Sequence, residues 1–543
     1  MFERENRQFV SLMTSLIFLL VVITISACAK PAPTVTSPSA TPKAAPTSVP
    51  PEEAADGPDP TDASTSEPAP AQPDPAQPET DWDDREVFRA GLIGAEQAVL
   101  DQLPNATVYH INLEIPDDFL VPSGQQDVRY TNQESEPLNE VYFRLFPNVS
   151  GGALTVSGVQ VNGETVEPTY ESRDSSLRVP LPTALQPGGQ VVIQMNFEVQ
   201  VTRDMAGNYG LFGYFDEVLV LDEFYPAIPA YDDEGWYAYT PAPNGDLSYF
   251  DASFYLVRVT APANLVIAAS GIEIGREQEG DRQIVTIAAG PARDFYLAAS
   301  KHYVVASETV GETTVNSYAF AERKEGAELA LEITARALKI FSERFGTYPY
   351  TEFDVASTPM QALGIEYPGM TGITLNVYDL NADVLGLPAP AMMESVVAHE
   401  VGHQWFYNVV GSDQMGEPWV DEAIVQYITG LYYVDAYGKN AAQGYHDSWY
   451  YRWNRVERAK IPIGLPAGDY EGSEYGAIVY GRGPIFVQTL AEEMGQETFD
   501  EFLRDYYESH KWGIGTGDTF RQIAEQHCQC DLTEIFEVWV YGD

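Results

Sequence analysis

The chain has 543 residues, more than a single hydrophobic core normally holds, so two folded domains plus non-globular segments are expected. Hydrophobic residues make up 44% of the chain and aromatic residues 12%, which excludes a wholly disordered protein. The chain has 30 Lys and Arg residues and 80 Asp and Glu residues, which gives a formal net charge of -50. Because this charge repels phosphate backbones, we expect no nucleic-acid partner.

Residues 1–28 have the pattern of an export signal that ends in a lipidation site. Arg4 and Arg7 precede an apolar run, and the segment Ile25-Ser26-Ala27-Cys28 then resembles the bacterial lipoprotein signal. We therefore expect Cys28 to be lipidated and to anchor the chain to the outer face of the bacterial cell membrane. The alternative is an uncleaved amino-terminal membrane anchor, because the apolar run is nearly long enough to span a bilayer. Both interpretations place the rest of the chain outside the cytoplasm.

Residues 29–84 consist mainly of Pro, Ala, Ser, Thr, Asp and Glu, with almost no large apolar side chain. Such a segment cannot bury enough surface to fold. The sequence predicts a disordered acidic linker that extends away from its anchor, because prolines favour an extended backbone and carboxylates repel one another.

Residues 85–315 predict an amino-terminal antiparallel β domain. Residues 109–115 alternate apolar and polar side chains, which is the period of a half-buried strand, and Asn162-Gly163 is a turn signal. Further strand-like segments lie at residues 141–146, 159–161, 191–199 and 254–259. A short amphipathic helix is expected before them, at residues 87–103.

Residues 316–543 predict a mainly α domain, so the overall fold class is α+β. Apolar residues recur at helical spacing over residues 325–345, and Gly346 ends the pattern. Only three cysteines are present, too few for a disulfide framework. Cys528 and Cys530 are interpreted either as a pair of buried thiols or as a local bridge at the surface.

The segment His399-Glu400-Val401-Gly402-His403 carries the strongest chemical signal. It lies in a predicted helix over residues 390–410, where a spacing of four places His399 and His403 on one face, so that both rings can bind one metal ion. Glu400 is rotated by about 100° and can reach a water molecule on that metal. A second apolar helix begins near residue 417 and supplies Glu422 as the natural third ligand. Two imidazoles and one carboxylate predict one catalytic Zn²⁺ per chain, with a fourth position open to water.

These motifs resemble the gluzincin aminopeptidases, the family of aminopeptidase N and leukotriene hydrolase. The likeness consists of the zinc motif, eighteen intervening residues and Glu422, with His403-Gln404-Trp405-Phe406 continuing the pattern of the zinc helix. Trp419-Val420-Asp421-Glu422 is similar to the Trp-Leu-Asn-Glu of the family, with Asp421 in place of asparagine. The resemblance extends from about residue 109 to the end, and implies a saddle-like β domain followed by a thermolysin-like catalytic domain. The large helical domain of bigger members has no counterpart, which implies a more open cleft.

Two further segments complete the resemblance. Gly364-Ile365-Glu366-Tyr367-Pro368 is similar to the substrate strand of the family, usually Gly-Ala-Met-Glu-Asn, and implies that Glu366 binds the α-amine of the substrate. Val479-Tyr480-Gly481-Arg482-Gly483 is similar to its Tyr-x-Lys-Gly segment, and implies that the Tyr480 hydroxyl supports the oxyanion. Tyr475, five residues earlier, is the alternative tyrosine for that role. The amine-binding side chain that the β domain of such enzymes usually adds is not assigned.

The function implied is that of a zinc metallopeptidase in which Glu400 activates the zinc-bound water, and which removes amino-terminal residues from peptides. An endopeptidase of the same fold is the nearest alternative. Epoxide hydrolysis, which one relative performs, has no specific support. A surface-binding lipoprotein with a vestigial zinc site is a third possibility, but a binding protein needs no general base. Side-chain preference, oligomeric state and physiological substrate stay open.

Overall fold

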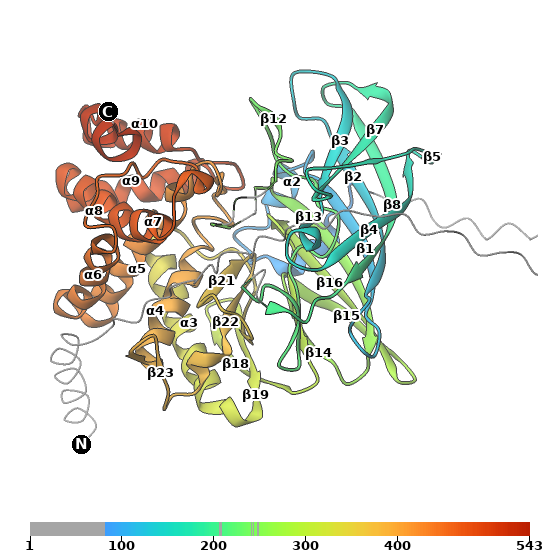
Figure 1. Cartoon of the computed structure of the whole chain (residues 1–543), viewed down its shortest axis with the longest axis horizontal. Helices are drawn as coiled ribbons and strands as arrows, with labels where there is room; N and C mark the ends of the chain where they lie inside the picture. Colours follow the sequence, from blue (N-terminus) through green and yellow to red (C-terminus); the bar gives the residue numbers. More distant parts are fainter. Residues whose placement is uncertain (1–81, 206–208, 241, 243, 247–248, 543) are drawn as a thin grey trace, which may run out of the picture. The chain divides into compact units, whose positions relative to one another are not determined.

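The computed structural model describes residues 82–542, apart from residues 206–208, 241, 243 and 247–248, and these residues belong to one compact unit (Figure 1). The expected export signal, Cys28 and the linker up to residue 81 lie outside the described residues. Among the residues that are described, no helix combines the length and the apolar character needed to cross a membrane.

Trp82 and Asp83 of the expected linker contact the β region, so the linker ends earlier than residue 84. The Trp82 ring stacks on His110 with ring centroids 4.5 Å apart, and Asp83 forms an ion pair with the buried Arg129. The aromatic stacking and the ion pair both fix the chain at this point.

The amino-terminal region is built mainly from three sheets. Its eight-stranded sheet has the order β15-β16-β13-β1-β2-β8-β4-β5, and every neighbouring pair is antiparallel except β1 and β13. The strands are β1 Val108–Glu114, β2 Ser123–Thr131, β4 Ala153–Val161, β5 Glu164–Thr165, β8 Gln190–Gln200, β13 Ser253–Pro262, β15 Ile272–Glu279 and β16 Arg282–Ala292. Figure 1 shows the long strands of this sheet side by side.

Two smaller sheets and a hairpin complete this region. The four-stranded sheet has the order β14-β17-β10-β9, and the three-stranded sheet has the order β3-β7-β6. Their strands are β9 Phe212–Phe215, β10 Val218–Leu221, β14 Val266–Ala269, β17 Leu297–Ser300, β3 Leu138–Arg144, β6 Thr169–Glu171 and β7 Ser176–Leu185, and the hairpin is β11 Tyr231–Asp232 with β12 Gly235–Trp236.

Alternation of side chains explains why the eight-stranded sheet buries one face. Along β8, the side chains of Val191, Ile193 and Met195 are buried while those between them face outward to varying degrees. They pack in one cluster with Ile111 and Leu113 of β1. The predicted antiparallel β domain is therefore confirmed, with one parallel pair added.

The expected helix at residues 87–103 is wrong as a single element. The structure has a 3₁₀ turn, η1 Glu86–Gly91, and a separate short helix, α2 Val99–Gln102. Between them Leu92 is extended and pairs with Tyr350, which interrupts the helical pattern.

The second region begins with a five-stranded sheet of order β18-β19-β20-β22-β21. Its strands are β18 Tyr303–Val310, β19 Thr313–Phe320, β20 Glu352–Thr358, β21 Gly364–Tyr367 and β22 Met370–Thr374. The expected boundary between residues 315 and 316 falls inside β19, so this sheet starts earlier, at Tyr303. A strand hairpin turns tightly at residues 311–312 and keeps β18 beside β19.

Helices make up the rest of the second region, as predicted. They are α3 Lys324–Phe345, α4 Ala389–Gly402, α5 Glu422–Tyr437, α6 Lys439–Asn454, α7 Glu474–Ala477, α8 Gly483–Met494, α9 Gln496–Ser509, α10 Gly517–Cys528 and α11 Thr533–Phe536. A short hairpin, β23 Asp383–Val384 and β24 Leu387–Pro388, precedes α4. The aromatic side chains Phe341 and Phe345 of α3 pack against the segment after α4, through Trp405 and Phe406.

Arg293 joins the two regions. It follows β16 and is 2% exposed, and its guanidinium donates to the backbone carbonyls of Asn408, Val409, Phe250 and Gly513 at 2.5 to 3.3 Å. Two of these carbonyls lie just beyond the zinc-motif helix. The path of the chain after that helix is therefore held by a residue of the amino-terminal region.

Candidate metal centre

Helix α4 carries the zinc motif in the interior of the second region. Its residues from Val396 to Gly402 are buried, which fits a helix that is apolar on nearly all sides. Gly402 faces α5 closely, since a Cβ there would lie 3.0 Å from Val425 Cγ1. This close approach brings the first residue of α5, Glu422, beside the motif. The helix ends at Gly402 and not at residue 410 as expected. The N–H groups of Gln404 and Trp405 donate to carbonyls three residues back, and Tyr407 then has a φ of 141°, which no α-helix accepts.

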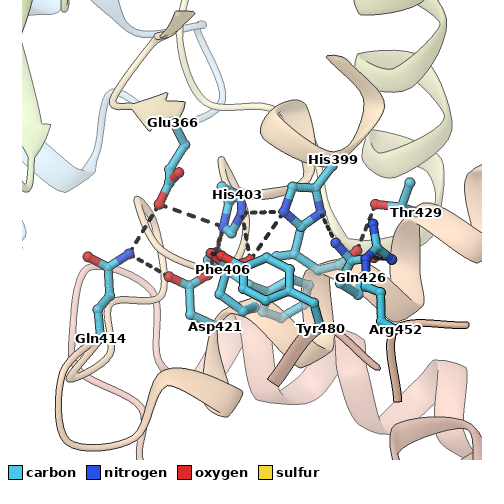
Figure 2. Close-up of polar contacts among 12 residues, drawn as sticks. Glu366, His399, His403, Phe406, Gln414, Asp421, Gln426, Thr429, Arg452 and Tyr480 are labelled. Carbon is cyan, nitrogen blue, oxygen red and sulfur yellow. Dashed lines mark hydrogen bonds and ion pairs between the residues drawn. The ribbon is translucent and has the colours of Figure 1, made fainter. Parts of the chain in front are cut away.

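His399, His403 and Glu422 bring three ligand atoms together. Figure 2 shows the two histidine rings next to each other. The Nε2 atoms of the two histidines lie 3.2 Å apart, and Glu422 Oε2 lies 3.2 Å from His399 Nε2 and 3.7 Å from His403 Nε2. Tetrahedral zinc with bonds of about 2.0–2.1 Å needs ligand atoms roughly 3.3 Å apart. The donor set and its spacing therefore fit one zinc ion.

The ionisation of the ligands also suits a cation. Burial lowers the pKa of His399 to about 4, so its imidazole is neutral at pH 7. Burial alone would raise the pKa of Glu422, but the hydrogen bond with His399 and the charge of His403 lower it to about 2. Burial lowers the pKa of His403, yet the carboxylates around it outweigh this effect and raise it well above its usual value. The carboxylates that favour a proton on His403 would equally favour a metal cation, which takes the place of that proton when it binds.

Asp421 supports His403 from behind. Its Oδ1 lies 2.7 Å from His403 Nδ1, which leaves Nε2 directed at the other two ligand atoms. Glu366, His403 and Asp421 also lie close enough together to suggest a second metal site. That group uses the Nδ1 atom already bonded to Asp421, and the amide of Gln414 lies between the two carboxylates. We interpret it as the hydrogen-bonded support of the first site.

Glu400 lies against strand β21. It is 5% exposed, and burial together with the nearby carboxylate of Glu366 raises its pKa well above the usual value. A Cβ on Gly364 would lie only 2.4 Å from Glu400 Oε1. Glycine at position 364 therefore leaves the space that the Glu400 carboxylate occupies.

Glu366 projects from the same strand and is 5% exposed. Burial raises its pKa to about 7, with the charge of His403 opposing and the carboxylates of Asp421 and Glu422 adding to the shift. Its Oε1 lies 4.0 Å from His403 Nδ1. The predicted amine anchor is thus next to the metal ligands, at one edge of the site in Figure 2.

Tyr480 lies in a π-helical turn, η8 Ile478–Arg482, and its hydroxyl donates a hydrogen bond to Glu422 Oε1. Burial, and then the charge of Glu422, raises the pKa of Tyr480 well above its usual value, so the hydroxyl keeps its proton. The Tyr475 ring is 5.8 Å from that of Tyr480. Of the two tyrosines, Tyr480 is the one bonded to a metal ligand.

Sequence reasoning missed two residues near the site. Gln414 is buried and contacts both Glu366 and Asp421, but an isolated glutamine in a loop belongs to no motif. Asp246 comes from the amino-terminal region, and its pKa is raised well above the usual value by burial and by the carboxylates of Glu366 and Glu422. Only the fold brings Asp246 near them.

Cys528 and Cys530 form a disulfide, so the local bridge is the correct alternative. The neighbouring His527 pairs with Asp505 at 3.0 Å. These residues take no part in the metal centre.

Comparison with known proteins places these features in a family. Residues 329–539 match the family model described as Peptidase family M1 domain. The chain is 21% identical over 483 residues to Aminopeptidase 2 of Candida albicans, covering 83% of this chain and 48% of that protein. It is 21% identical over 408 residues to Aminopeptidase N of Lactobacillus helveticus, covering 71% of this chain and 46% of that one. The chain thus spans about half the length of these curated relatives, or less.

Solved structures share the fold. The M1 zinc metallopeptidase from Deinococcus radiodurans superimposes with a TM-score of 0.61 at 21% identity, covering 80% of this chain and 93% of that one. A mutant of that enzyme bound to a Tyr-Ser-Ala substrate gives a TM-score of 0.59 with similar coverage. The α+β fold, with a β-rich region before a helical one, agrees with these structures. Residues 329–539 thus match peptidase family M1, and the motifs and the fold of the chain are similar to those of its gluzincin aminopeptidases.

Proposed function

We propose that this chain is a zinc-dependent aminopeptidase that removes residues from the amino end of peptides. One observation carries the proposal: the Nε2 atoms of His399 and His403 and Glu422 Oε2 lie within 3.7 Å of one another, beside a buried glutamate. The aminopeptidase names of the relatives and the peptide bound to the similar structure support the same activity.

In this proposal His399, His403 and Glu422 hold the zinc ion, which would polarise the scissile carbonyl and activate water. Glu400 accepts the proton of the attacking water and passes it to the departing amine, a role that suits a carboxyl whose pKa is raised by burial. The Tyr480 hydroxyl donates a hydrogen bond to the oxyanion that develops on the carbonyl.

Glu366 sets the position of the cut. Its ionised carboxylate accepts charge-assisted hydrogen bonds from the protonated α-amine of the substrate. An amine held beside the metal ligands leaves room for one residue before the scissile bond, so a single residue is released.

The test compares fluorogenic aminoacyl amides that carry free or acetylated amino groups, using purified protein of measured zinc content. We expect cleavage of the free-amine substrates only, and no cleavage by Glu400→Gln protein that still holds zinc. Cleavage of acetylated peptides would support the endopeptidase instead. Full activity of Glu400→Gln protein would refute the mechanism, and absence of any Glu400-dependent cleavage would favour a binding protein.

We also propose that the enzyme acts outside the cytoplasm, tethered through a lipid on Cys28. The proposal rests on the lipoprotein-like segment Ile25-Ser26-Ala27-Cys28. Expression with a radiolabelled fatty acid would label the wild-type chain, and the Cys28→Ala chain would stay unlabelled. Equal labelling of both chains would exclude Cys28 as the anchor, and a membrane-bound but unlabelled wild type would favour an uncleaved anchor.

A further inference from the structure

The side-chain amide of Gln414 lies between two carboxylates of the site. Its Nε2 is 3.1 Å from Glu366 Oε1 and 2.6 Å from Asp421 Oδ2, and the side chain is 2% exposed (Figure 2). Both partners are also buried, Glu366 at 5% and Asp421 at 1% exposed. One nitrogen therefore holds two carboxylates that come from different elements, the strand β21 and the start of α5.

The chemistry of the partners determines which way the amide faces. The oxygens of Glu366 and Asp421 that face Gln414 can accept hydrogen bonds, whereas an amide NH₂ group has two hydrogens to donate. Gln414 therefore directs its nitrogen at Glu366 and Asp421. Its Oε1 is buried without a hydrogen-bond partner among the described residues. Gln414 thus makes these two contacts even though its own carbonyl oxygen is left unsatisfied.

Asp421 links Gln414 to the metal ligand His403. One of its carboxylate oxygens lies 2.7 Å from His403 Nδ1, and the other accepts from Gln414. An asparagine at this position, as in the similar Trp-Leu-Asn-Glu segment, would have only one oxygen. If that oxygen bonded to His403, its NH₂ group would face the NH₂ group of Gln414. The carboxylate of Asp421 and the amide of Gln414 are therefore chemically matched.

We propose that Gln414 is a positioning residue that sets the spacing between the amine anchor Glu366 and the zinc ligand His403. The proposal rests on the aminopeptidase function proposed above. The chain of contacts runs from Glu366 through Gln414 and Asp421 to His403, and each link is a hydrogen bond between buried groups. Because two buried carboxylates would otherwise face each other, the amide also lets both stay in place.

The test replaces Gln414 by leucine, which has a similar volume and no donor. We expect KM for free-amine substrates to rise about tenfold, the effect of one charge-assisted hydrogen bond, with a smaller change in kcat. Gln414→Asn, one methylene too short to reach both carboxylates, should give an intermediate effect. The matched control is Gln283→Leu. Gln283 is also buried, and its amide donates to the backbone carbonyls of Pro262 and Leu265, which take no part in the metal centre.

Combination with Glu366→Gln separates positioning from a general structural effect. If Gln414 acts through Glu366, Gln414→Leu raises KM in the wild-type background and changes it little when Glu366 is already glutamine. An equal rise in KM in both backgrounds would overturn the proposal, as would a KM in Gln414→Leu protein equal to that of the Gln283→Leu control.

Zinc affinity gives a readout that does not depend on turnover. Competition with a chromogenic chelator should show zinc bound about threefold more weakly by Gln414→Leu than by Gln283→Leu protein, since support of a histidine ligand contributes to metal affinity. If the wild-type chain cleaves no peptide but this difference is found, the proposed function fails while the positioning role stands. Equal zinc affinity in the two variants would count against the role of Gln414.

Discussion

Replacing Gly364 by alanine should remove activity without removing the fold. The added Cβ would lie 2.4 Å from Glu400 Oε1 and 2.7 Å from its Cδ and Cγ, where ordinary contact begins near 3.4 Å. The Glu400 carboxylate must therefore retreat by about 1 Å. The end of a side chain moves more easily than the two paired strands β21 and β22, so the displacement falls on the catalytic group. A misplacement of about 1 Å can lower a rate roughly 100-fold.

Steady-state kinetics with a free-amine aminoacyl amide would measure this loss. We expect kcat/KM to fall about 100-fold, with the zinc content and the melting temperature close to those of the wild type. The matched control is Gly476→Ala, because a Cβ at Gly476 meets no atom within 4 Å. Wild-type activity in Gly364→Ala protein would show that Glu400 does not need this space, and the reasoning would be refuted.

Three other predictions concern separate parts of the molecule. Tyr480→Phe should lower kcat about 100-fold with little change in KM, whereas Tyr475→Phe should leave kcat unchanged. If steady-state kinetics instead show the larger loss of kcat in Tyr475→Phe protein, Tyr475 is the oxyanion donor. Burial raises the pKa of Glu352 to about 7, so the folded state binds this proton more tightly than the unfolded chain. The contribution of this proton to the free energy of unfolding is therefore complete below about pH 4.5 and is lost as the pH rises through 7. Glu352→Gln should therefore raise the free energy of unfolding relative to the wild type by about 2 kcal/mol more at pH 8 than at pH 5 in urea titrations, and a pH-independent difference would contradict this. Arg293→Lys should lower the free energy of unfolding by about 3 kcal/mol, because a lysine cannot reach all four carbonyls, whereas the exposed Arg258→Lys should change little in the same titrations.

Much of the metal centre could be predicted from the sequence because helical geometry is local. A spacing of four residues on a helix already places His399 and His403 together, and the start of a second apolar helix locates Glu422. The alternation of side chains along β8 likewise predicts which face of its sheet is buried.

The contacts that depend on tertiary packing could not be predicted in this way. Gln414 gains its role only because β21 and α5 meet at its amide, and Asp246 approaches the site from a distant segment. The end of α4 at Gly402 and the unusual backbone of Tyr407 five residues later are not revealed by the helical pattern of apolar residues. The start of the second sheet at Tyr303 depends on pairing between β18 and β19, because Tyr303 is the one buried side chain of β18 and no alternation of buried and exposed residues marks that strand.

The four carbonyls bound by Arg293 matter to anyone who wishes to dissect this protein. A fragment that begins at Tyr303 would contain the whole metal centre. The backbone carbonyls of Asn408, Val409 and Gly513 would then lose the hydrogen bonds that the Arg293 guanidinium donates to them. A fragment that ends there would instead retain a guanidinium with most of its acceptors gone. Shortened versions intended for crystallisation or display should therefore keep residues 82–542 together, and engineering of the cleft is better done by substitution than by exchanging one region for that of a relative.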